Sequence, residues 1–329
     1  MNVKKQYDVV ALGELLIDFT SSGMSANGNI LFEANAGGAP CNVLSMVKRF
    51  GHQVGFIGKV GQDMFGEQLK DTLYELGIET KNLMMDEGHP TTLAFVKTAT
   101  NGERDFSFYR NYCADIMICE ADILQEQTQA MIEQAKIFHF GTLSLTHESN
   151  RLATYKAIEI AKESGASISF DPNLRKVLWS DLAEAKKQFT YGFTQCDILK
   201  ISDEELVWYY EEDNLEKCIC NLRKEFPNVQ MLLLTSGKEG SKAYYKDYVV
   251  EVAGFVREET LDTTGAGDTF FGTCIHFVLE KGLEGFGQEE LAKMLRYANM
   301  AASIITTKKG ALKVMPTKDE IFEALEQFQ

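Results

Sequence analysis

The chain has 329 residues, enough to bury a large core, and this length suits one large domain with an appendage better than two ordinary domains. Its 33 lysines and arginines stand against 48 aspartates and glutamates, and the formal charge of −15 disfavours nucleic acid and anionic lipid as partners. The N-terminal residues lack the apolar segment of a signal peptide, no run is long enough to span a bilayer, and the seven cysteines contain no C-x-x-C pair, so we expect a cytoplasmic protein without disulfides or a cysteine-held zinc ion.

The first predicted strand brings acidic side chains to one edge of a sheet. Residues 9–13 form a short apolar run that predicts a buried strand, and Glu14 and Asp18 follow it. Ligands of open parallel sheets bind at the carboxyl ends of the strands, so Asp18 is a candidate for hydrogen bonding to a polyol. The alternative is that Asp18 is an acid in a solvated loop.

Two adjacent glycines mark the start of the first predicted helix. Gly37 and Gly38 precede a helix that we expect to reach about Arg49. Without side chains, they let a ligand approach the backbone, and Asn42 offers both a donor and an acceptor to a sugar hydroxyl. The alternative is a tight turn that needs no ligand.

The next segments predict a parallel sheet and then a lid. A strand at 54–58 and an amphipathic helix ending at Leu76 continue the alternation of strand and helix. Two runs that alternate apolar with polar residues then flank Asn101-Gly102, a strong hairpin signal, with no helix between them. We expect this hairpin to stand off the main sheet as a lid that carries Phe108 and Arg110 over a site. An edge hairpin of the main sheet is the alternative.

From residue 137 the alternation of strand and helix resumes. The remaining predicted strands are 137–141, 167–170, 197–201, 231–234, 242–246 and 248–253. The predicted helices are 120–135, 148–164, 181–194, 203–210, 214–226, 286–306 and 317–327.

Polar groups follow several of these strands at the ligand-binding edge. The turn after residue 170 presents Asp171 and Arg175, and the strand ending at residue 201 leads into Ser202 and Glu205. The spacing Ser-x-x-Glu is also that of a capping box, so a purely structural role for this pair is a strong alternative.

A glycine-rich turn, Asp262-Thr-Thr-Gly-Ala-Gly-Asp268, precedes an apolar helix. Glycines at a helix N-terminus expose unpaired backbone N–H groups, and the helix dipole adds about half a positive charge there, which predicts an anion-binding site. Asp268 would then lie where a hydroxyl must lose its proton to receive a phosphoryl group. The alternative is that Thr264 caps the helix and Asp268 only complements its dipole.

Two long motifs in this sequence resemble those of the ribokinase-like (PfkB) carbohydrate kinases. The first is Gly37-Gly-Ala-Pro-Cys-Asn42 with the glycine-rich segment 55–66, and the second is the turn at 262–268. The motifs around Asp115, around Asp171 with Trp179, and at 199–205 are similar to those of fructokinases in particular. The resemblance covers essentially the whole chain.

The resemblance implies a role for each matching position. Asp268 is expected as the catalytic base, with Gly265, Ala266 and Gly267 as the anion hole. The substrate is expected to contact Asp18, Gly37, Gly38, Asn42, Arg110 and Arg175. The ATP side is expected to comprise Lys200, Ser202, Glu205, Thr235, Gly237, Gly240 and Asn299.

The resemblance also implies metal ions. Asp262 and Thr264, with the loop 306–311, match a monovalent-cation site, although potassium dependence varies among family members. Mg²⁺ is expected through water on Glu205, since a carboxylate anchors metal-bound water better than a hydroxyl does. Ser202 replaces the usual asparagine of an Asn-x-x-Glu motif, which leaves its ligand role in doubt.

The expected fold is one three-layer α/β/α sandwich over residues 1–329, with a mostly parallel, doubly wound sheet and a β lid inserted from about 14–35 and 90–112. The expected reaction is ATP-dependent phosphorylation of D-fructose to fructose 6-phosphate. Alternatives are a 2-keto-3-deoxygluconate kinase, another sugar or nucleoside kinase, and an inactive sugar sensor, which the intact Gly-Ala-Gly-Asp disfavours. Because exposed lid strands need covering, we expect a homodimer joined through the lids.

Overall fold

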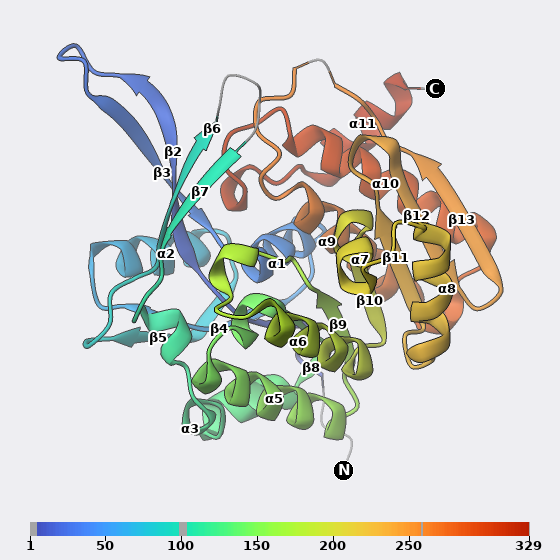
Figure 1. Cartoon of the computed structure of the whole chain (residues 1–329), viewed down its shortest axis with the longest axis horizontal. Helices are drawn as coiled ribbons and strands as arrows, with labels where there is room; N and C mark the ends of the chain where they lie inside the picture. The colour runs from blue at the N-terminus through green and yellow to red at the C-terminus, as the bar shows by residue number, and fades with distance from the viewer. Residues whose placement is uncertain (1–4, 99–103, 258, 329) are drawn as a thin grey trace.

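Nine strands form the central sheet of the computed structural model, which describes residues 5–98, 104–257 and 259–328. In spatial order they are β13 (Tyr248–Ala253), β12 (Gly240–Tyr245), β11 (Met231–Thr235), β10 (Ile198–Ser202), β9 (Ser167–Asp171), β8 (Ala135–Gly141), β1 (Tyr7–Leu12), β4 (Val54–Gly61) and β5 (Glu79–Asp86). Neighbours from β11 to β5 pair in parallel, and β12 and β13 add an antiparallel edge. The chain builds outward from β1 to β5 and then returns to β8 to build the other half (Figure 1). This reversal is the doubly wound order that was predicted.

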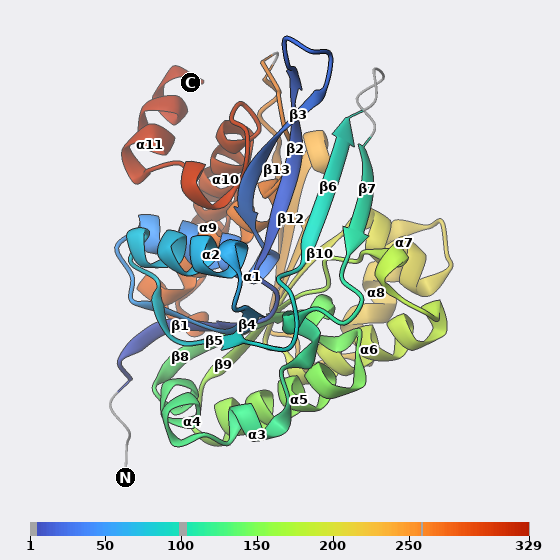
Figure 2. The same cartoon turned by 90° about the vertical axis from the view of Figure 1, so that its left-hand side faces the viewer.

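Helices cover both faces of this sheet, as Figure 2 shows. One face carries α3 (Glu120–Ile123), α4 (Glu126–Glu133), α5 (Glu148–Glu163), α6 (Leu182–Gln195), α7 (Asp203–Tyr210) and α8 (Leu215–Glu225). The other carries α1 (Ala39–Arg49), α2 (Met64–Glu75), α9 (Ala266–Lys281) and α10 (Gln288–Ile305), with α11 (Lys318–Gln327) packed on α10. Along β1, Val10 and Leu12 pack on the first face, and Val9 and Ala11 on the second. Both faces are therefore buried, which explains the continuously apolar strands.

Four further strands form the lid, a separate sheet that projects from the main body (Figures 1 and 2). In spatial order they are β3 (Ile30–Gly37), β2 (Leu16–Met24), β6 (Leu93–Thr98) and β7 (Arg104–Tyr109). The predicted lid is confirmed, and the alternative of an edge hairpin on the main sheet is wrong. The predicted turn at Asn101-Gly102 lies outside the described residues. The exact limits of the lid insertions, 14–35 and 90–112, stay a prediction.

One predicted helix differs from the structure, and one strand of the main sheet was not predicted. The helix expected over 120–135 is two helices, because Gln125 between α3 and α4 has an extended backbone. β5 was not predicted as a strand, since its first half is polar, as suits an outermost strand. Short 3₁₀ helices occur at Ala114–Met117 (η1), Thr142–Leu145 (η2), Lys176–Leu178 (η3), Gly237–Glu239 (η4), Leu283–Gly285 (η5) and Leu312–Val314 (η6). Within the described ranges, no helix combines the length and the apolarity that crossing a membrane requires.

Helices α1 and α9 pack side by side and point in the same direction. The two helices contact each other at Asn42–Asp268, Met46–Gly272 and Phe50–His276. Each contact comes four residues after the previous one in both segments. A Cβ atom on Gly272 would lie 2.7 Å from Cβ of Met46 and 2.9 Å from the carbonyl oxygen of Val43, so the absence of a side chain permits this close approach. The packing sets the N-terminus of one helix directly against that of the other.

Candidate active site

One pocket of about 400 Å³ lies at the carboxyl ends of the central strands, where the strand order reverses. Open doubly wound sheets bind their ligands at this position. The pocket also receives the N-termini of α1 and α9. It is lined by Glu14, Leu16, Asp18, Gly38, Ala39, Asn42, Phe108, Leu143, Asn173, Arg175, Lys200, Thr263, Thr264, Gly265, Gly267 and Asp268.

The glycine-rich turn forms the start of α9. Gly265 is the N-cap, with a left-handed φ of 76°, and as a glycine it has no side chain that could accept a hydrogen bond from the first N–H groups of the helix. A Cβ atom on Gly265 would lie 2.8 Å from Cβ of Ala311. Thr264 instead donates its backbone N–H to Oδ1 of Asp262 at 2.8 Å, so the interpretation of Thr264 as the cap is wrong. The uncapped helix end is a suitable binding site for an anion.

Asp268 is buried in the first turn of α9 and pairs with Asn42. Nδ2 of Asn42 donates to Oδ2 of Asp268 at 2.8 Å. Burial raises the pKa of Asp268, against the lowering effects of this hydrogen bond and of the positive charges of Lys200 and Arg175. Among the described residues, Oδ1 of Asn42 is buried with no hydrogen-bond partner. Because buried polar atoms are normally satisfied, this oxygen points to a ligand that donates a hydrogen bond.

A buried ion pair lies beside the same turn. Nζ of Lys200 contacts both carboxylate oxygens of Asp171, at 3.0 and 3.2 Å. Burial lowers the pKa of Lys200, but the carboxylates of Asp171 and Glu205 outweigh this effect and raise it, so the ammonium stays charged. A Cβ atom on Gly267 would lie 3.0 Å from Nζ of Lys200. The turn therefore holds a cation next to the anion-binding helix end.

The first strand and the lid supply the acidic wall of the pocket. Glu14 is buried and accepts the backbone N–H of Ala39 at 2.8 Å. Burial raises its pKa to about 7, against the lowering effect of the Arg110 charge. Gly38 has a φ of 131°, and a Cβ atom on it would overlap the carbonyl oxygen of Glu14. A Cβ atom on Gly37 would overlap the carboxylate of Asp18, so both glycines are required for close packing of this wall.

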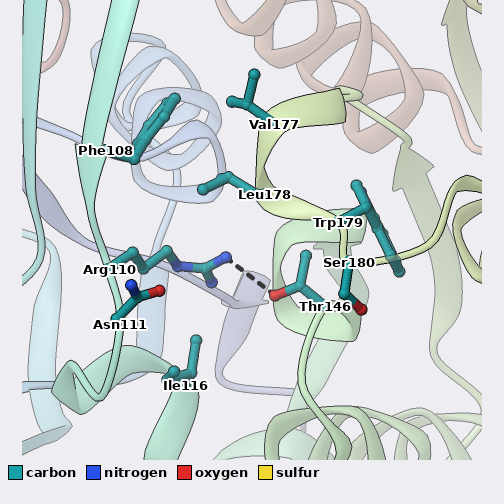
Figure 3. A pocket seen from close by; sticks show the side chains of 9 residues that line it. All are labelled: Phe108, Arg110, Asn111, Ile116, Thr146, Val177, Leu178, Trp179 and Ser180. Carbon is teal, nitrogen blue, oxygen red and sulfur yellow. Dashed lines mark hydrogen bonds between the residues drawn. The ribbon is translucent and has the colours of Figure 1, made fainter.

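The two predicted substrate-binding arginines lie in different places. Arg175 lines the pocket with Asp268, and its charge acts on that carboxylate. Arg110 lines a neighbouring cavity of about 470 Å³ between the lid and η3 (Figure 3). It is buried there and donates to Asp115 at 2.7 Å, to Thr146 at 3.0 Å and to the carbonyl of Leu143 at 2.9 Å. The structure does not bring Arg110 to Asp268, and its substrate-binding role stays a prediction.

The predicted ATP-side residues lie on β10 and β11, directly after them, or on α10, and of these only Lys200 lines the pocket that holds Asp268. Glu205 accepts the backbone N–H of Ser202 at 3.0 Å, and Glu205 N–H donates to Oγ of Ser202 at 3.2 Å, which is the capping box considered as an alternative. Glu205 also accepts the N–H of Leu174 at 2.7 Å, so it joins the turns after β9 and β10.

Three further ATP-side positions lie at the end of β11, and a fourth lies on α10. Thr235 ends β11, and Gly237 begins η4 with a φ of 50° and open space around it. Gly240 begins β12, and a Cβ atom on it would overlap the carbonyl oxygen of Val252. Asn299 accepts Oγ–H of Ser241 at 2.8 Å and donates to the carbonyls of residues 252 and 253. The amide of Asn299 thus ties α10 to the antiparallel edge.

The residues expected to form a monovalent-cation site lie close together beside the glycine-rich turn. The backbone N–H of Asp262 donates to the carbonyl of Thr306 at 3.1 Å, and Ala311 packs against Gly265. The loop 306–311 and the turn 262–268 are therefore neighbours. Their carbonyl and carboxylate oxygens are the ligand type that hard cations prefer.

Several residues that line the pocket, and Asp171 behind Lys200, were not assigned a role from the sequence. Asp171 and Glu14 were noticed as acids at strand ends, and burial is what distinguishes them from ordinary loop acids. Asn173 has a φ of 47° in the turn after β9, a signal visible only in the backbone. Leu143 carries no sequence signal, because an apolar residue after a strand is ordinary.

Comparison with known proteins identifies the family. The family model described as "pfkB family carbohydrate kinase" matches residues 6–318. The chain is 40% identical over 319 residues to a probable fructokinase-2 of Arabidopsis thaliana, covering 96% of this chain and 95% of that protein. A fructokinase of Xylella fastidiosa with bound ATP superposes with a TM-score of 0.85 at 29% identity, covering 98% of this chain and 99% of that one.

A second solved structure contains a bound sugar and a bound nucleotide. It is a fructokinase double mutant of Vibrio cholerae O395 with fructose, ADP and potassium ion bound, with a TM-score of 0.85 and 26% identity over 98% of this chain and 99% of that one. The family match spans far more than half of the chain, and the relatives are matched over almost their full length. The chain therefore belongs to the pfkB family of carbohydrate kinases.

Proposed function

We propose that this chain is an ATP-dependent fructokinase, which transfers the γ-phosphoryl group of ATP to the primary hydroxyl of D-fructose and gives fructose 6-phosphate. The observation that carries the proposal is a buried aspartate, Asp268, in the first turn of an uncapped helix at the floor of a polyol-sized pocket. The names of the relatives and the sugar and nucleotide in the related structures support this assignment.

Asp268 is the proposed general base. Burial raises its pKa, which makes its carboxylate a stronger proton acceptor than a solvated aspartate. Asn42 holds this carboxylate through Nδ2, and its unpartnered Oδ1 is available to accept a hydrogen bond from the sugar. Asp18 and Glu14 on the opposite wall can accept further hydroxyl groups. The sugar is thus oriented with one hydroxyl at Asp268.

The turn at 265–267 is the proposed anion hole for the phosphoryl group in transfer. Gly265 and Gly267 offer backbone N–H groups at a helix N-terminus, the N–H of Ala266 between them makes a long hydrogen bond of 3.3 Å to the carbonyl of Thr263, and Lys200 holds a positive charge beside Gly267. Phosphoryl transfer depends on positioning and on stabilising the negative charge of the equatorial oxygens, which such a site provides. Arg175 adds a second cation from the turn after β9.

The residues beyond Lys200 are proposed to hold the nucleotide and its metal ions. Ser202, Thr235, Gly237, Gly240 and Asn299 would line the nucleotide side. Glu205 fits water-mediated Mg²⁺ binding through Oε1, because this oxygen accepts the N–H of Leu174 and keeps a second lone pair, whereas Oε2 accepts both the N–H and the hydroxyl of Ser202. Mg²⁺ supplies charge neutralisation between phosphates when it is bound. K⁺ is the monovalent cation proposed for the oxygens around Asp262, Thr264 and the loop 306–311.

An ADP-release assay tests the function. Purified protein with ATP and Mg²⁺ is given D-fructose and 2-keto-3-deoxygluconate side by side, followed by a wider sugar panel. We expect preferred turnover of fructose, with a product that phosphoglucose isomerase and glucose-6-phosphate dehydrogenase convert with NADPH formation, as fructose 6-phosphate requires. Preference for the acid, or a product that these coupling enzymes do not accept, would overturn the assignment.

One observation favours 2-keto-3-deoxygluconate as a second candidate substrate. Arg175 lines the pocket and could pair with a carboxylate of that substrate. Two acidic side chains, Glu14 and Asp18, line the same pocket and would repel a carboxylate close to them. The neutral sugar therefore remains the preferred substrate, and the side-by-side assay decides between the two.

The proposed enzyme works in the cytoplasm as a homodimer joined through its lids. All seven cysteines are free, which suits a reducing compartment. The lid strands β2 and β3 expose Met24, Ile30, Leu31 and Phe32, each more than 40% accessible, and a second lid could cover them. A monomer by light scattering at working concentration would contradict the dimer, and recovery in a membrane or secreted fraction would contradict the compartment.

A further inference from the structure

A second cluster of chemically active side chains lies at the far end of the helix pair α1–α9. His276 and Glu280 are four residues apart on α9 and so share one face of the helix. His52 belongs to the turn between α1 and β4. His276 is eight residues after Asp268, which places it about 12 Å further along the helix axis, outside the active-site pocket.

The three side chains converge on a small volume. Nε2 of His52 lies 2.8 Å from Nδ1 of His276, and one ligand atom from each of His52, His276 and Glu280 lies within 4.8 Å of the others. The ring of Phe50 stacks on the ring of His276, with centroids 4.0 Å apart and parallel planes. The stacking holds the His276 ring in one orientation, with Nδ1 directed at His52.

The other ring nitrogen of His52 faces a carboxylate. Nδ1 of His52 lies 3.5 Å from Oδ2 of Asp8. Asp8 is itself fixed, because it accepts the backbone N–H of Gln53 at 2.8 Å and Nζ of Lys136 at 2.7 Å. A histidine whose second nitrogen donates to a carboxylate is the usual arrangement around a bound metal ion, because the carboxylate sets the tautomer and the ring orientation.

The geometry suits a tetrahedral ion after a small adjustment. Two imidazoles bound to Zn²⁺ at about 2.0–2.1 Å place their nitrogen atoms roughly 3.3 Å apart, so the present pair needs to open by about half an ångström. Glu280 is exposed, and its carboxylate already lies within 4.8 Å of both histidine nitrogens, so a rotation of its side chain can bring it closer. The carboxylates of Asp8 and Glu280 attract a cation here, against the flanking ammonium groups of Lys136 and Lys318.

We propose that His52, His276 and Glu280 form a binding site for a divalent transition-metal ion of the zinc class, with solvent as the fourth ligand and Asp8 orienting His52. Two histidines and one glutamate with an open position are a ligand set that Zn²⁺ accepts. The ion would link α9 to the turn after α1. The other ends of these two helices hold Asp268 against Asn42. A bound ion would therefore restrain the relative position of α1 and α9, which carry the proposed base and its hydrogen-bond donor.

Cobalt substitution tests the site directly. The untagged protein is treated with a chelator, exchanged into buffer and titrated with Co²⁺ under visible absorption spectroscopy and with Zn²⁺ by calorimetry. We expect one ion per chain, a tetrahedral Co²⁺ spectrum without thiolate charge-transfer bands, and displacement of Co²⁺ by Zn²⁺. Zn²⁺ should also raise the melting temperature of the chain.

Variants separate this site from the other metal-binding groups of the chain. His276→Gln and His52→Gln should each weaken binding at least a hundredfold, and Glu280→Gln about tenfold, since it leaves both imidazoles in place. His89→Gln is the matched control, because His89 also faces a carboxylate, Asp86 at 3.1 Å, but lies outside the cluster. Glu280 is exposed, so its variant should fold if a histidine variant does not. No stoichiometric binding, a cysteine-type spectrum, or binding that neither His52→Gln nor Glu280→Gln weakens would overturn the proposal.

Discussion

Two buried polar pairs meet beside the glycine-rich turn, and they differ in how fully their groups are satisfied. In Asn42–Asp268 a neutral amide donates one hydrogen bond to a carboxylate, and the amide oxygen has no partner within the described residues. In Lys200–Asp171 an ammonium contacts both oxygens of a carboxylate. The first pair thus keeps binding capacity for a ligand, whereas the second is largely satisfied within the protein.

The difference separates two tasks of a phosphoryl-transfer site. The Asp268 carboxylate is hydrogen-bonded by a neutral amide, and burial raises its pKa against the lowering effects of that hydrogen bond and of the Lys200 and Arg175 charges, as suits a base. Asp171 supplies the negative charge that keeps Lys200 protonated in a buried position, and Lys200 in turn lies next to Gly267. One pair therefore provides the proton acceptor, and the other provides a fixed cation for the phosphoryl oxygens.

The largest expected effect comes from removing the base. Asp268→Asn keeps the shape of the side chain and its contact with Asn42 but cannot accept a proton, so kcat should fall by about 10²- to 10⁴-fold. The melting temperature should stay close to that of the unaltered chain, because no buried charge is left unpaired. A steady-state ADP-release assay with fructose measures the effect, and a rate near the original would remove Asp268 from the mechanism.

The second pair should respond in stability as well as in rate. Lys200→Met leaves the Asp171 carboxylate buried without its counter-ion, which should lower the free energy of unfolding by about 3–5 kcal/mol. Adding Asp171→Asn removes the stranded charge and should restore most of the stability. The double variant should still be slow, because the cation beside Gly267 is absent.

Urea unfolding and kcat, measured on both variants, distinguish a structural from an electrostatic role for Lys200. Recovery of stability without recovery of kcat is the expected result. If the double variant recovers both, Lys200 contributes to the fold alone. If Lys200→Met is as stable as the original chain, the ion pair does not contribute the stability that its burial suggests.

The sequence indicated the residues of both pairs as candidates, but it did not indicate which residue contacts which. Asn42 and Asp268 were each predicted from the residue pattern at a helix start, yet their hydrogen bond joins positions 226 residues apart. Lys200 was expected on the ATP side, and its partner Asp171 lies 29 residues earlier at the end of the neighbouring strand. Local periodicity indicates strands and helix starts, but strand order and helix packing decide which side chains meet.

The same reasoning explains where the fold was predicted well. Apolar runs and glycine-marked helix starts gave the parallel sheet and its ligand-binding edge, because both depend on local pattern. The edge strand β5 and the break between α3 and α4 were missed, since a polar edge strand and a single extended residue at Gln125 leave weak local signals. The burial of Glu14 could not be predicted either, because it depends on tertiary packing.

Glu14 tests whether burying a carboxylate that accepts only a backbone N–H is costly in this pocket. Burial raises its pKa from 4.5 to about 7, so between these values the folded state binds more protons than the unfolded state, and stability falls as pH rises. Above pH 7 the ionised Glu14 carboxylate should lower the free energy of unfolding by about 3 kcal/mol. Glu14→Gln keeps an acceptor for Ala39 and should flatten this dependence between about pH 5 and 8 in urea unfolding.

The control for this experiment is Glu163→Gln, an exposed acid at the end of α5. Its pH dependence should follow the original chain. An equal slope for Glu14→Gln and the original chain would show that ionising Glu14 costs no stability, and the contrast between the two polar pairs would then not extend to this wall.

The smallest expected effect concerns the donor to the base. Asn42→Ala removes the hydrogen bond that lowers the pKa of Asp268, so this pKa should rise further and the acid limb of kcat/KM should move to higher pH. A hydrogen bond to a charged group is worth about 1.5–3 kcal/mol, which corresponds to a loss of about tenfold or more on that limb. Met46→Leu, one turn further along the same helix contact, controls for packing and should leave the profile in place. A uniform loss at every pH would assign Asn42 to sugar binding alone, whereas a shifted limb would show that the incompletely satisfied pair tunes its own base.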